Sequence, residues 1–135
     1  MNKRTLSLTV GVAILLAATL GFAANNSSQE ISTAAVHAHL AASAPNVATV
    51  HLHLHHVINC LVGTKGKLFD ADAGNPCKGM GDGALNDLGN APAEHKELRR
   101  VLVMSERALR TEQLAAARED ATHIADALKE ATPKK

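Results

Sequence analysis

The stretch VATVHLHLHHVINCL, residues 47–61, decides the fold. Its apolar residues could follow the two-residue period of a β-strand or the 3.6-residue period of an α-helix. A period of two would place alternate histidines on one face of a β-strand: His51, His53 and His55. That alternation fails at His56, which is followed by two consecutive apolar residues. A period of 3.6 gathers all the apolar residues except Leu52 within an arc of about 100°. We therefore predict a helix over residues 46–62.

Three more helices are predicted around this one. Residues 30–44 are alanine-rich with helical spacing, follow a polar and frayed segment at 25–29, and end before Pro45. Pro92 suits the first turn of a further helix. A faint repeat, 70 residues apart, aligns the 46–62 segment with the C-terminal region and predicts helices over 92–111 and 115–131. One unbroken helix over residues 93–132 is the alternative.

The predicted fold is all-α. Two helical hairpins form an up-down four-helix bundle, and a long loop over residues 63–91 joins them. This loop is rich in Gly, Asp and Asn and has no sustained periodicity. Cys60 and Cys77 are expected to form a disulfide that staples the loop to the end of the second helix, with paired thiolate metal ligands as the alternative. Leu68 and Phe69 are expected to fold back as an apolar plug.

The N-terminus is typical of export. Residues 1–23 combine Lys3 and Arg4, an apolar stretch and small residues, which predicts a signal peptide; a retained membrane anchor is the alternative. Cleavage would leave a single domain over residues 24–135, with 12 of the 14 basic side chains against 13 acidic ones. This near-neutral balance favours neither nucleic acid nor a charged membrane as a partner. The mature protein is expected in the periplasm or outside the cell, without stable membrane association.

The histidines form the one cluster of side chains in this sequence that indicates a binding site. Residues i, i+3 and i, i+4 of a helix share a side, so His51 pairs with His55 and His53 with His56. A hairpin that turns near Pro45 would bring His37 near His53, and His39 near His51. The sequence therefore predicts a transition-metal site for copper, zinc or nickel with six candidate ligands: His37, His39, His51, His53, His55 and His56. His95 and His123 are isolated and are expected at the surface.

Catalytic motifs are not evident. Residues 31–69 contain no Asp or Glu, which counts against a zinc hydrolase. The segment from Asp70 begins like a calcium loop, but Gly74 and Gly81 occupy ligand positions. We therefore expect no enzymatic activity.

Residues 34–58, and more loosely 104–131, resemble the small periplasmic histidine-rich metal-binding proteins. The resemblance implies a periplasmic four-helix bundle that buffers or scavenges copper, nickel or zinc through histidine. The regular histidine repeat of that group is not kept in the C-terminal half, and the stapled loop is additional. Two other functions stay open: a periplasmic chaperone or stress-type interaction protein, and a b-type haem bundle with a histidine axial ligand.

Overall fold

A computed structural model describes residues 22–132, and every regular element in this range is a helix. The elements are α1 (Phe22–Ser43), α2 (Val47–Val62), α3 (Ala84–Asp87), α4 (Pro92–Ala108) and α5 (Leu114–Ala131). The all-α prediction is confirmed. Residues 1–21, which hold nearly all of the expected signal peptide, lie outside the described range.

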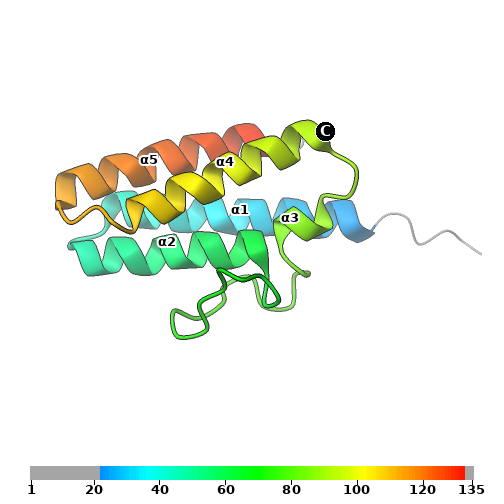
Figure 1. Ribbon diagram of the computed structural model, residues 1–135, viewed down its shortest axis with the longest axis horizontal. Coiled ribbons are helices and arrows are strands. Elements are labelled where there is room, and N and C mark those ends of the chain that lie inside the picture. Colours follow the sequence, from blue (N-terminus) through cyan, green and yellow to red (C-terminus); the bar gives the residue numbers. More distant parts are fainter. Residues whose placement is uncertain (1–21, 133–135) are drawn as a thin grey trace, which may run out of the picture.

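The four long helices run along the long axis of the molecule (Figure 1). The chain reverses between α1 and α2, and again between α4 and α5, so that each pair forms a hairpin. Across the hairpins, α1 packs on α5 and α2 packs on α4. The segment between α2 and α4 lies at one end of α2 and contains α3 (Figure 1).

The start of α2 and its end follow the local chemistry of the sequence. Asn46 caps the helix, since its Oδ1 atom accepts the backbone N–H of Thr49 at 2.9 Å. Gly63 ends the helix with a φ of 66°, a conformation that glycine adopts without steric cost, and its N–H donates to the Asn59 carbonyl. Pro92 occupies the first turn of α4, as expected.

Several boundaries differ from the sequence prediction. Helix α1 begins at Phe22, so the segment 25–29 is helical and not frayed. Burial explains this extension, because the side chains of Ser27 and Glu30 are each 1% exposed and belong to the packed part of the helix. The third long helix ends at Ala108 and not at residue 111, and the predicted loop contains the short helix α3. The alternative of one helix over 93–132 is wrong.

Alanines line the side of α1 that faces the core. Ala34, Ala38 and Ala41 are fully buried, and small side chains allow neighbouring helices to approach closely. Helix α1 also contributes the fully buried Ile31, and further large core residues come from the other three long helices: Val50, Leu54, Val57, Leu61, Leu98, Val101, Ile124 and Leu128. Leu52 lies 43% exposed, which confirms the helical phase of α2.

The disulfide between Cys60 and Cys77 is present and ties the loop to the last turns of α2. The predicted apolar plug forms only in part: Phe69 packs against the core, but Leu68 is 41% exposed. Among residues 22–132, no helix is both long enough and apolar enough to cross a bilayer.

A buried carboxyl group joins α1 to the segment before α3. Glu30 Oε1 accepts the Gly83 N–H at 2.9 Å, whereas Oε2 is buried with no hydrogen-bond partner among the described residues. Burial and the nearby carboxylate of Asp87 raise the pKa of Glu30 from 4.5 to about 7, against the opposing effect of the Gly83 hydrogen bond. Glu30 therefore exchanges a proton near neutral pH.

We expect Leu54→Ala to lower the free energy of unfolding by about 2–5 kcal/mol, because it removes a fully buried side chain. The matched variant Leu52→Ala, two residues away in the same helix, should change it by no more than about 0.5 kcal/mol. Urea denaturation of both variants measures the difference. Similar losses in the two variants would contradict the helical phase of α2.

We expect Glu30→Gln to stabilise the protein above pH 7. A carboxyl group whose folded pKa is raised contributes stability below its unfolded pKa of 4.5, and this contribution is lost as pH rises through about 7. Glutamine keeps the acceptor for Gly83 and carries no charge. Denaturation at pH 4.5 and pH 8 should show a gain only at pH 8, and an equal effect at both values would contradict the assignment.

Candidate metal centre

Three histidines from two helices meet on one side of the α1–α2 hairpin. His37 of α1 has its Nδ1 atom 3.1 Å from His53 Nδ1 and 3.1 Å from His56 Nδ1. One nitrogen from each ring lies within 4.8 Å of the other two, so the group can bind a metal ion. Among residues 22–132, no other group of three histidine, cysteine or acidic side chains gathers in this way.

The positions of these residues in the two helices explain the convergence. His53 and His56 are three residues apart on α2, so their side chains leave the same side of the helix. The reversal at residues 44–46 places His37 opposite them. Ala34 and Ala38 beside it are fully buried, and such small side chains allow close helix packing, which lets one imidazole reach two others.

The protonation of His56 follows from its second contact. His56 Nε2 lies 2.7 Å from the carbonyl oxygen of Ala73, and a carbonyl only accepts, so Nε2 carries the proton. In the neutral ring, Nδ1 then has a free lone pair directed at His37. His37 Nδ1 is the common member of both short nitrogen contacts, so in the neutral cluster a single proton on it serves two acceptors. If the His37 proton moves from Nδ1 to Nε2, a metal ion between the rings would receive one lone pair from the Nδ1 atom of each neutral ring.

Burial favours the neutral form of two of these rings, those of His37 and His53. Desolvation, followed by the neighbouring His56 and His53, lowers the pKa of His37 from 6.5 to about 4. Desolvation and His56 also lower the pKa of His53. A histidine must be neutral to bind a metal, so the lowered pKa values of His37 and His53 favour metal binding at neutral pH.

The separations suit metal coordination. Zinc–nitrogen bonds of about 2.0–2.1 Å in a tetrahedron place neighbouring ligand atoms about 3.3 Å apart. Two of the three pairs are already at 3.1 Å. All three side chains are half-buried, which leaves room for water or another ligand to complete the coordination.

Only half of the six predicted ligands belong to this centre. His39 is exposed, because a two-residue step along a helix turns by about 200° and points it away from His37. The expected His39–His51 pair is therefore wrong: His51 Nε2 donates to the Thr111 carbonyl at 3.1 Å, in the turn before α5.

The predicted pair of His51 and His55 does not act together either. His55 Nδ1 faces the carboxylate of Asp70 at 3.2 Å, in the long loop. The remaining two histidines stay apart from the centre, as expected: His95 donates to the Gly89 carbonyl, and the His123 side chain is 64% exposed.

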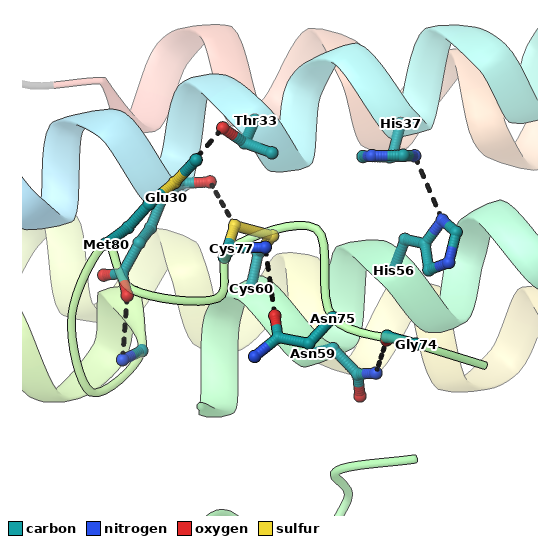
Figure 2. The surroundings of a disulfide bond; sticks show 11 residues. Glu30, Thr33, His37, His56, Asn59, Cys60, Gly74, Asn75, Cys77 and Met80 are labelled. Atoms are coloured by element: carbon teal, nitrogen blue, oxygen red, sulfur yellow. Dashed lines mark hydrogen bonds between the residues drawn. A yellow bond between two sulfur atoms is a disulfide. The ribbon is translucent and has the colours of Figure 1, made fainter. Parts of the chain in front are cut away.

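Hydrogen bonds between the Asn59 side chain and the backbone of the long loop, which the sequence analysis did not predict, hold the loop beside the centre. The Asn59 side chain donates to the carbonyl oxygens of Asp70 at 2.7 Å and Gly74 at 2.6 Å, and accepts the Asp70 N–H at 2.8 Å. Figure 2 shows Asn59 near the disulfide, with His56 further along α2 and His37 facing it from α1. A lone Asn within the apolar run of residues 57–62 was the available signal, because a buried amide requires polar partners.

Comparisons of the chain with protein-family models, curated proteins and solved structures found no match. The functional argument therefore rests on the geometry of the side chains.

We expect the ring of His37 to titrate near pH 4 in metal-free protein. A lowered histidine pKa means that the folded state binds fewer protons than the unfolded state between pH 6.5 and about 4, so stability falls as pH falls through this window. NMR titration of the ring resonances measures the pKa directly. In addition, His37→Gln should make the acid-induced loss of stability less steep; a His37 ring that titrates near 6.5 would contradict the burial argument.

Proposed function

We propose that this protein is an exported, non-enzymatic metal-binding protein that holds one divalent transition metal at His37, His53 and His56. One observation carries the proposal: three Nδ1 atoms from two helices converge, with His37 within 3.1 Å of both partners. Imidazole nitrogen suits zinc, copper and nickel, whereas calcium and magnesium prefer oxygen.

The half-burial of the centre favours reversible binding. Structural zinc sites are usually closed by four protein ligands, whereas three ligands leave a position for water or for a ligand from another molecule. A metal held in this way can exchange with the surroundings. This supports a role in buffering or scavenging metal, which is also the role implied by the resemblance to small periplasmic metal-binding proteins.

The wider setting agrees with this role. The disulfide is typical of an oxidising compartment, which agrees with the export predicted from residues 1–23. We interpret the two hairpins as an up-down four-helix bundle, a fold that often carries metals on facing helices. Near the centre, the carboxylate of Asp70 contacts His55, which is not one of the three proposed ligands.

We expect metal-free wild-type protein to bind one zinc, copper(II) or nickel ion in a saturable titration by calorimetry. His37→Ala should weaken binding at least about tenfold, since one of three donor bonds is lost. His39→Ala is the matched control, because His39 lies two residues away on the same helix and points to solvent.

The control variant should bind like the wild type, and circular dichroism should show that both variants stay folded. Absence of saturable binding in the wild type, or equal losses in the two variants, would contradict the proposal.

A further inference from the structure

The long loop contacts the candidate metal centre through one backbone group. The carbonyl oxygen of Ala73 accepts the Nε2 proton of His56 at 2.7 Å. This contact uses the ring nitrogen that faces away from His37. Metal-binding histidines commonly donate their second N–H to a carbonyl or carboxylate, which fixes both the tautomer and the orientation of the ring.

We propose that the Ala73 carbonyl is a positioning group of the metal centre, held in place by Asn59 and by the disulfide. By occupying Nε2, it leaves Nδ1 as the metal-binding atom of His56 and directs it towards His37. This inference rests on the proposed function, because it concerns how the same centre achieves its geometry.

Three residues on one side of α2 hold the loop in the required place. His56, Asn59 and Cys60 stand at i, i+3 and i+4, so they form a continuous row along the helix (Figure 2). His56 contacts Ala73, Asn59 contacts Asp70 and Gly74, and Cys60 is bonded to Cys77. The loop therefore lies along α2 from residue 70 to residue 77.

The loop also orders itself around Ala73. Asp70 Oδ1 accepts the N–H groups of Asp72 at 3.0 Å and Ala73 at 3.2 Å, which closes a tight turn. Asn59 binds the backbone at both ends of this turn, through Asp70 and Gly74. Loss of Asn59 would release three hydrogen bonds together and free the Ala73 carbonyl to move.

The chain offers a control that makes the same kind of contact as Asn59 from an exposed position. Asn86 also donates from its side chain to two carbonyl oxygens, those of Val62 and Asp82, and also joins the end of α2 to the segment that follows it. Its contacts lie away from the three histidines. A general loosening of the loop region should therefore follow from either substitution, whereas an effect on His56 should follow only from a change at Asn59.

The test compares Asn59→Ala with Asn86→Ala in zinc titrations and in long-range proton–nitrogen NMR of the histidine rings. We expect Asn59→Ala to weaken zinc binding about 10–100-fold, the range measured for groups that orient metal ligands. Asn86→Ala should stay within about twofold of the wild type. In zinc-loaded wild type, His56 should bind the metal through Nδ1 and keep its proton on Nε2; in Asn59→Ala this pattern should be lost.

A second variant tests the same proposal if Asn59→Ala does not fold. Cys60→Ser combined with Cys77→Ser opens the staple without adding a sulfur ligand, and should also weaken zinc binding and disturb the His56 signals. If the wild type binds zinc and these variants bind it equally well with His56 on Nδ1, the positioning role is wrong and the metal site stands. If the wild type binds no zinc, both the site and the role of Ala73 in it are wrong.

Discussion

The close packing of α1 on α2 is the contact on which the structure and the candidate site both depend. Ala34, Ala38 and Ala41 of α1 are fully buried, and their small side chains allow neighbouring helices to approach α1 closely. The same approach allows the His37 ring to reach His53 and His56 on the neighbouring helix. Larger side chains at the alanine positions would separate the helices and the three rings together. Fold and site therefore share one structural requirement.

The environment of the three rings makes them suitable for a cation. Burial disfavours the protonated forms of His37 and His53, so the pKa of each is lowered and one ring nitrogen of each has a lone pair available at neutral pH. The loop adds direction, because the Ala73 carbonyl holds the far nitrogen of His56. Helix packing thus brings the three rings together, and desolvation favours the neutral form of His37 and His53. The loop fixes the orientation of the His56 ring. The disulfide matters to the site because it anchors that loop.

Much of this arrangement could be predicted from periodicity and chain reversal. The apolar phase of residues 47–61 predicted the helix, and the turn near Pro45 predicted the pairing of His37 with His53. The partners of His51 and His55 could not be predicted, because Thr111 and Asp70 come from a distant turn and an irregular loop. The predicted pairing of His39 with His51 failed because it considered only which residues lie at the same height in the hairpin. It did not consider that His39 and His37 point to opposite sides of α1. Burial of Ser27 and Glu30, and hence the early start of α1, depends on tertiary packing that no local pattern reports.

The central claim is that His37, His53 and His56 form one metal centre through their Nδ1 atoms. A crystal structure of the zinc-loaded protein, with anomalous diffraction at the zinc edge, tests it most directly. We expect a single strong anomalous peak between α1 and α2, about 2.0–2.1 Å from all three Nδ1 atoms, with Ala73 still bonded to His56 Nε2. A peak at His39, His51 or His55 instead, or no peak beside His37 at full zinc occupancy in solution, would contradict the account.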